Sequence, residues 1–298
     1  MSKDKKPQCP FIQRFAEDLK LARKSERTVQ SYCRALRKLS EYLGHDPSQA
    51  CEENIRKYLL FITDEKKWSS STVNVALQAL KLYYRVTCPR DWAILKLARV
   101  KVEQKLPVVI SIGEVQTLLK LIEKPAMQCY FTVVYHLGLR LNEALHLQIS
   151  DIDSKRMMVH IHRGKGAKDR MIPLAEVTLE VLRKYWATHR NPRWIFPAEG
   201  RDHKQAPTAT KPMSESSVQD VIKAVLDQLN WSERGISTHT LRHCYATHLL
   251  EAGVSLKLIQ KYLGHKHLTS TMIYLHITTV GEEAEVDNIP LPIEHPTQ

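Results

Sequence analysis

The chain has 298 residues, of which 43% are hydrophobic, and its 44 Lys and Arg against 32 Asp and Glu give a formal net charge of +12. This length and apolar content exclude a disordered chain or a small disulfide-held domain, and they allow one large or two ordinary globular domains. The excess of positive charge favours a polyanionic partner, most simply nucleic acid.

The first part of the chain, residues 1–100, is predicted to form a helical domain. Apolar residues recur at helical spacing over residues 25–43, and Gly44 is placed to end that helix. Further helices are expected over residues 52–64 and 70–87. We therefore expect a compact bundle of four helices that binds DNA.

A stripe of basic side chains lies opposite the apolar face of the predicted 25–43 helix. It consists of Arg27, Arg34 and Lys38. Because the whole domain is basic, we interpret the stripe as a DNA-binding surface that contacts backbone phosphates. A solvated helix face without a partner is the alternative interpretation.

Residues 101–111 break the helical period and contain a proline, which predicts an extended linker between two domains. The second domain is predicted over residues 112–280. It begins with helices over residues 112–123 and 125–148, and Gly138 interrupts the second of them.

The hydrophobic period then changes from that of a helix to that of a strand. Residues 157–162 and 170–174 flank a Gly-rich turn, which predicts a β-hairpin. Helices are expected to resume over residues 176–189 and 215–229, then from a cap at Ser237 or Thr238 to Gly253, and over residues 255–263. The tail, residues 281–298, is acidic and contains prolines, so no long terminal helix is expected. The predicted fold class is mainly α with a small β-sheet.

The cysteines and the apolar runs indicate a cytoplasmic protein. The six cysteines form no Cys-x-x-Cys pair, so we expect reduced thiols in the core rather than disulfides or a zinc site. The start of the chain lacks the apolar segment of a signal peptide, and no apolar run is long enough to cross a membrane. We therefore expect no membrane partner.

Six side chains of the second domain carry the groups that breaking a phosphodiester requires: Arg140, Lys165, His239, Arg242, His265 and Tyr274. Guanidinium groups suit the non-bridging phosphate oxygens, and imidazoles can donate to those oxygens or move protons. A lysine in a Gly-flanked turn can protonate the leaving oxygen, while a tyrosine can attack phosphorus. Because the arginines supply the charge that Mg²⁺ would otherwise neutralise, we expect no metal and no other cofactor.

In chain order these residues lie in the motifs GLRLNEAL, HRGKGAKDRMIPL, HTLRHCYATHLL, LGHKH and TSTMIYLHI. Together the motifs resemble the tyrosine recombinase (phage integrase) family, in particular its simple two-domain, Xer-like members. The resemblance implies a helical, SAM-like core-binding domain followed by a mixed α/β catalytic domain. It also implies that the six residues form the catalytic set and that Glu143 supports Arg140.

The resemblance further implies a site-specific DNA strand transferase. Tyr274 would attack the scissile phosphate and form a 3′-phosphotyrosine, while Lys165 protonates the departing 5′-oxygen. The implied partner is double-stranded DNA with paired recombination sites, bound by a homotetramer. The same likeness implies a nucleoid-associated location and a role in DNA integration or in transposition of a mobile genetic element, and it leaves chromosome-dimer resolution and integron cassette exchange open as alternatives.

Two other functions remain as alternatives. One is a type IB topoisomerase, which uses a similar set of phosphate-binding groups, and the other is a non-catalytic DNA-binding regulator on the same scaffold. Within the site, Lys168 is the alternative to Lys165, and Tyr262 is the rival nucleophile. His239 and His243 have the i,i+4 spacing of a metal pair, but no HExxH glutamate accompanies them.

Overall fold

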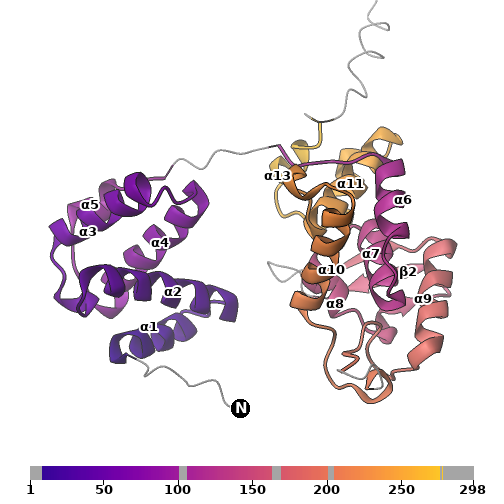
Figure 1. Cartoon of the computed structure of the whole chain (residues 1–298), viewed down its shortest axis with the longest axis horizontal. Helices are drawn as coiled ribbons and strands as arrows, with labels where there is room; N and C mark the ends of the chain where they lie inside the picture. The colour runs from indigo at the N-terminus through magenta and orange to yellow at the C-terminus, as the bar shows by residue number, and fades with distance from the viewer. Residues whose placement is uncertain (1–8, 101–105, 163–168, 201–204, 276, 278–298) are drawn as a thin grey trace, which may run out of the picture. The chain divides into compact units, whose positions relative to one another are not determined.

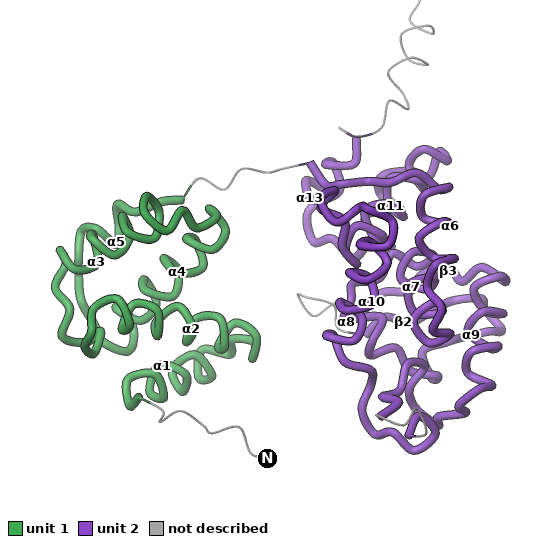
Figure 2. Tube along the Cα trace, viewed as in Figure 1, with its two compact units in different colours: residues 1–105 green, residues 106–298 purple. Residues whose placement is uncertain are grey.

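The computed structural model describes residues 9–100, 106–162, 169–200, 205–275 and 277. The chain divides into two compact units, Met1–Lys105 and Leu106–Gln298, and each unit has a hydrophobic core of its own (Figures 1 and 2). Mostly helical structure with one small sheet confirms the predicted fold class.

Unit 1 is built from α1 (Pro10–Leu21), α2 (Glu26–Leu43), α3 (Glu52–Leu60), α4 (Ser70–Leu82) and the short α5 (Ala93–Leu97). Helices α3 and α4 each continue into a π-helical turn, Phe61–Glu65 and Tyr83–Thr87. The apolar stripe of α2 faces the core, where Leu36 and Leu39 are fully buried. Gly44 ends α2 with φ 74°, a left-handed conformation that glycine adopts without steric cost.

Unit 2 carries the remaining helices of the described residues: α6 (Ile112–Lys120), α7 (Pro125–Leu137), α8 (Leu141–Leu145), α9 (Glu176–His189), α10 (Glu215–Gln228), α11 (Thr238–Glu251), α12 (Leu256–Leu263) and α13 (Thr269–Met272). Helix α7 is apolar on most of its surface and packs against both α9 and α11. It is therefore the central helix of the unit.

The sheet of unit 2 has three antiparallel strands in the order β1 (Ile152–Asp153), β2 (Met158–Ile161), β3 (Arg170–Pro173). The predicted hairpin pairing of β2 with β3 is confirmed, whereas its Gly-rich turn lies outside the described residues. Ile161 pairs with Arg170, and Val159 pairs with Ile172. All four side chains are buried, so this register points Arg170 toward the interior of the unit.

A small apolar cluster lies apart from the main core of unit 2. Its buried members, which we call the C-terminal cluster, are Ala246, Ile259, Leu263 and Tyr274. They come from α11, α12 and the turn after α13. The C-terminal helices are thus held together by their own contacts.

Residues 106–110 form no helix or strand, and Ile110 is buried in the core of unit 2. Its N–H donates to the Cys244 sulfur at 3.4 Å. The expectation that the cysteines are core thiols is wrong for Cys9 and Cys51, which are exposed, although all six are free. Within the described ranges, every helix is too short or too polar to cross a membrane.

Candidate active site

Three arginine side chains of the candidate site lie around the carboxylate of Glu143. Helix α7 ends at Gly138, whose φ of 58° turns the chain so that Arg140 caps α8 and Glu143 follows one turn later. The Glu143 carboxylate accepts from the Arg140 guanidinium at 2.7 Å and from the Arg140 backbone N–H at 2.9 Å. The Arg140 side chain is 27% exposed and is therefore partly accessible to a ligand.

Arg170 is a second partner of Glu143 and was not predicted from the sequence. Its two terminal nitrogens donate to the two Glu143 oxygens at 3.0 and 2.7 Å, and its Nε donates to the Tyr262 carbonyl at 2.7 Å. A sequence signal existed: Ile172 faces the core, and the period of two in a strand places Arg170 on the same face.

Arg242, on α11, is almost fully buried. It donates to the carbonyls of Gly138 and Leu263, both at 2.6 Å, and one of its nitrogens lies 3.8 Å from Glu143 Oε2. These bonds hold together the ends of α7 and α12. They also fix the guanidinium beside Arg140.

One carboxylate therefore faces three guanidinium groups. Burial alone would raise the pKa of Glu143, but the hydrogen bonds and charge of Arg170, followed by Arg140, outweigh it and lower that pKa to about 2. Burial and the neighbouring Arg140 lower the pKa of Arg242, while Glu143 opposes the shift. With Glu143 ionised and the arginines charged, the group retains an excess of positive charge suited to a phosphate.

The two predicted histidines lie near these arginines on separate segments. His239 is exposed at the start of α11, and desolvation, followed by the charges of Arg242 and Arg140, lowers its pKa. His265 follows the left-handed Gly264, and its Nδ1 lies 3.0 Å from the Thr271 hydroxyl. Burial, followed by Arg242 and Arg140, lowers the pKa of His265 to about 3. His265 is therefore neutral at pH 7.

Tyr274 is 1% exposed, and its hydroxyl lies 3.0 Å from Nδ1 of His243. Burial raises the pKa of Tyr274, while Arg242 and Arg140 oppose that shift. Burial, followed by the neighbouring His239 and Arg242, lowers the pKa of His243 to about 4. The phenol and the imidazole are therefore both neutral at pH 7.

His243 is a site residue that the sequence interpretation missed. The i,i+4 spacing to His239 suggests only a metal pair, and the centroids of the two rings do lie 4.7 Å apart. The sequence signal for His243 is its position directly after Arg242, within the same motif.

The other predicted residues lie elsewhere. Lys165 and its alternative Lys168 are outside the described residues. The rival nucleophile Tyr262 is partly buried within α12, and its carbonyl accepts from Arg170. The basic stripe Arg27, Arg34 and Lys38 follows α2 in unit 1. All three residues are exposed, and Lys38 forms an ion pair with Glu41 at 3.0 Å.

Comparison with known proteins identifies this arrangement. Residues 109–280, more than half of the chain, match the Phage integrase family, and residues 11–94 match its N-terminal SAM-like domain. The chain belongs to the phage integrase family. A putative integrase/recombinase of Sinorhizobium fredii, y4qK, is 35% identical over 91% of this chain and 85% of its own length. Tyrosine recombinase XerA of Pyrococcus horikoshii is 30% identical over 90% of both chains.

Solved structures support the fold of this integrase-family chain. XerH recombinase bound to a palindromic difH substrate superposes with a TM-score of 0.69 at 20% identity, covering 93% of this chain and 83% of that one. The Tn1549 transposon integrase in complex with transposon right end DNA gives 0.67 at 19% identity, over 94% and 99%. The predicted enzyme class is confirmed: the chain is a tyrosine-type, site-specific DNA recombinase. No observation favours a type IB topoisomerase or a non-catalytic regulator.

Proposed function

We propose that Tyr274 is the nucleophile of this recombinase and that it forms a 3′-phosphotyrosine with the scissile strand. The observation that carries this assignment is the contact of the Tyr274 hydroxyl with His243, one residue beyond the buried Arg242. The tyrosine is close enough to Arg242 and Arg140 for their charges to act on it. A phosphate bound by those guanidinium groups would lie next to the phenol.

The remaining groups have separable tasks in this proposal. Arg140 and Arg242 bind the non-bridging oxygens and stabilise the charge that develops at phosphorus. Neutral His265, held by Thr271, donates a hydrogen bond to the same phosphate, and exposed His239 provides another donor. Lys165 protonates the departing 5′-oxygen, as the family motif implies. Glu143 and Arg170 position Arg140 without touching the DNA.

A buried phenol with a raised pKa is not ready to attack. In this structure the Tyr274 hydroxyl contacts His243, and the side chain is covered. We infer that DNA binding moves the segment after α12 so that the hydroxyl reaches phosphorus. Phosphate binding and proton transfer then give the nucleophilic phenolate.

We propose that the substrate is double-stranded DNA with two recombination sites, bound by four copies of the chain. The DNA named with XerH is palindromic, and a palindrome suits two symmetry-related protein copies on each site. The basic stripe of α2 contacts backbone phosphates in this arrangement. Exchange of strands between two such sites would serve integration or transposition of mobile DNA, or the resolution of chromosome dimers, and a nucleoid-associated location is part of this proposal.

Covalent capture tests the nucleophile. Wild-type protein is first used to select cleavable sequences from a library of nicked duplexes, through SDS-resistant protein–DNA adducts. Tyr274→Phe should bind the selected duplex with unchanged affinity and give no adduct. The matched control, Tyr262→Phe, should form the adduct at the wild-type level.

An adduct with Tyr274→Phe, or loss of the adduct only in Tyr262→Phe, would overturn the assignment. Recombination between two plasmid-borne sites is measured beside relaxation of a supercoiled plasmid that lacks them. Joining of the paired sites is the expected result. Relaxation of both plasmids without joining would instead support a topoisomerase.

A further inference from the structure

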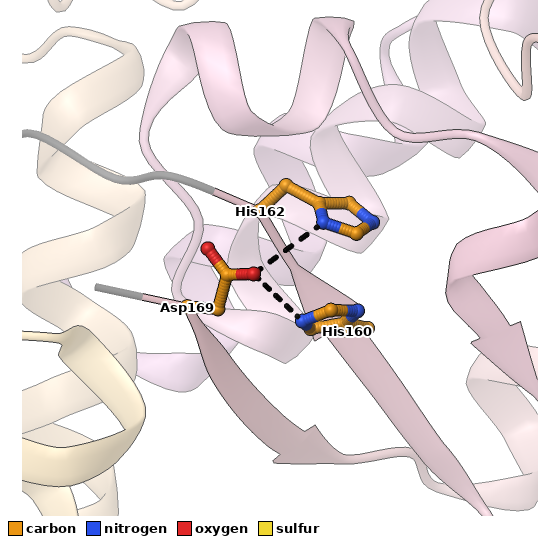
Figure 3. A group of neighbouring side chains, drawn as sticks. All are labelled: His160, His162 and Asp169. Atoms are coloured by element: carbon orange, nitrogen blue, oxygen red, sulfur yellow. Dashed lines mark ion pairs between the residues drawn. The ribbon is translucent and has the colours of Figure 1, made fainter. Parts of the chain in front are cut away.

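Two histidines and an aspartate converge at the end of the β2–β3 pair where residues 163–168 connect the two strands (Figure 3). His160 Nε2 lies 3.3 Å from Asp169 Oδ2, and His162 Nδ1 lies 3.7 Å from the same oxygen. One ligand atom from each residue lies within 4.8 Å of the others. None of the three belongs to the phosphodiester site described above.

The strand register builds this cluster. His160 is in β2, and His162 follows two residues later, so both side chains project from the same face of the hairpin. Asp169 immediately precedes Arg170, which pairs with Ile161. The face is opposite to that of Ile161 and Arg170, which are buried. The cluster is therefore accessible from solution, with side chains 36%, 52% and 45% exposed in chain order.

A second observation concerns the orientation of His162. Its Nε2 lies 2.7 Å from Oδ1 of Asp151, a carboxylate that is only 4% exposed. Asp151 is itself fixed by the backbone N–H of Gln148, at 2.8 Å. In neutral His162 the Nε2 atom donates to Asp151, so Nδ1 carries the lone pair and faces Asp169. A buried carboxylate that orients an imidazole in this way is typical of histidine ligands of metals.

The lone pair of His162 Nδ1 and the Asp169 oxygen are both acceptors, so a cation between them is favourable. An ion with bonds of about 2.0–2.1 Å to nitrogen and oxygen needs its ligand atoms about 3.4 Å apart in a tetrahedron. The separations of 3.3 and 3.7 Å from the Asp169 oxygen lie close to this value, and the two histidine nitrogens lie within 4.8 Å of each other. Imidazole and carboxylate together suit Zn²⁺ and related divalent transition metals better than Mg²⁺ or Ca²⁺.

We propose that His160, His162 and Asp169 bind a divalent transition metal of the Zn²⁺ class, with solvent in the remaining position. The ion links β2 to the residue before β3, and so ties together the two ends of residues 163–168. The proposal adds a ligand site to this recombinase and does not depend on the assignment of Tyr274. Its test measures metal binding and does not require DNA cleavage or recombination.

The experiment uses the full chain with the exposed thiols removed by Cys9→Ser and Cys51→Ser, so that sulfur ligands do not compete. Co²⁺ is added as a spectroscopic probe, and its displacement by Zn²⁺ is followed in the visible region. Zinc affinity is then measured by competition with a chromophoric chelator. We expect one equivalent of metal and a Co²⁺ spectrum without thiolate charge-transfer bands.

His160→Gln and Asp169→Asn should each weaken zinc binding by at least about tenfold. The matched control His267→Gln changes an exposed histidine outside the cluster and should leave the affinity unchanged. Because the replaced side chains are exposed, we expect each variant to fold, and circular dichroism verifies this. Absence of a Co²⁺ spectrum, or equal affinities in all three variants, would overturn the proposal.

Discussion

Replacing Glu143 with Gln removes the carboxylate charge that faces Arg140, Arg170 and Arg242. The side chain keeps its size, but the two guanidinium groups of Arg170 and Arg242 lose their counter-charge while they stay 6% and 1% exposed. Removing one partner of a buried ion pair costs about 3–5 kcal/mol, because the remaining charge is left without compensation. We expect the free energy of unfolding of unit 2 to fall by this amount at pH 7.

The pH dependence of the free energy of unfolding gives a second value for the contribution of Glu143. The pKa of Glu143 is lowered from 4.5 to about 2 in the folded chain, so its contribution is complete above pH 4.5 and is lost as the pH falls through 2. This pKa difference corresponds to about 3 kcal/mol, of which about 2 kcal/mol is lost by pH 3. The stability gap between wild type and Glu143→Gln should therefore narrow as the pH is lowered from 5 to 3.

Urea unfolding at several pH values measures the gap, with the transitions of the two units fitted separately. Glu176→Gln is the matched control, because Glu176 is 66% exposed and its partner Arg183 is 3.9 Å away. It should change stability by less than about 1 kcal/mol. A loss below 1 kcal/mol for Glu143→Gln, or a gap that does not narrow toward pH 3, would refute the reasoning.

Gly138→Ala should destabilise unit 2 by about 2–4 kcal/mol in urea unfolding, since φ is 58° and the new Cβ would lie 2.3 Å from Tyr245 Cδ1. Gly113→Ala, where a Cβ meets nothing within 4 Å, should instead add about 0.5–1 kcal/mol, and equal effects of the two changes would contradict this account. Single-turnover DNA cleavage should show no inflection near pH 6.5 from His243 or His265, whose pKa values are lowered to about 4 and about 3. An inflection there that disappears in His265→Gln would show that this histidine titrates at its ordinary pKa.

Much of the fold could be predicted because amphipathic periods identify buried faces without knowledge of their partners. In α2 the predicted apolar residues Leu36 and Leu39 are fully buried, and Gly44 ends the helix as expected. The π-helical turns after α3 and α4 were not predicted, since one extra residue in a turn leaves composition and caps unchanged. The strand pairing followed from the Gly-rich turn between two segments of period two.

From the sequence, only those residues of the candidate site that belong to a recognisable motif could be predicted. The described members of the predicted set all lie in unit 2: Arg140, His239, Arg242, His265 and Tyr274. The two arginines are close enough for their charges to act on the pKa values of the two histidines and the tyrosine. Their partners depend on distances that no motif contains. Arg170 meets Glu143 across 27 residues through strand register.

His243 was missed for a related reason. Its bond to Tyr274 spans 31 residues and depends on how the segment after α13 packs against α11. Helical spacing along α11 alone says only which of its residues share a face. Long-range packing, rather than local sequence, thus decides which neighbours of a motif become part of the site.

The C-terminal cluster has a consequence for the energetics of Tyr274. Ala246, Ile259, Leu263 and Tyr274 form a core separate from the main core of unit 2. Local opening of a small packing unit requires less free energy than unfolding of a whole domain. Tyr274, the proposed nucleophile, therefore belongs to a packing unit that can open while the scaffold of α7, α9 and α11 remains intact.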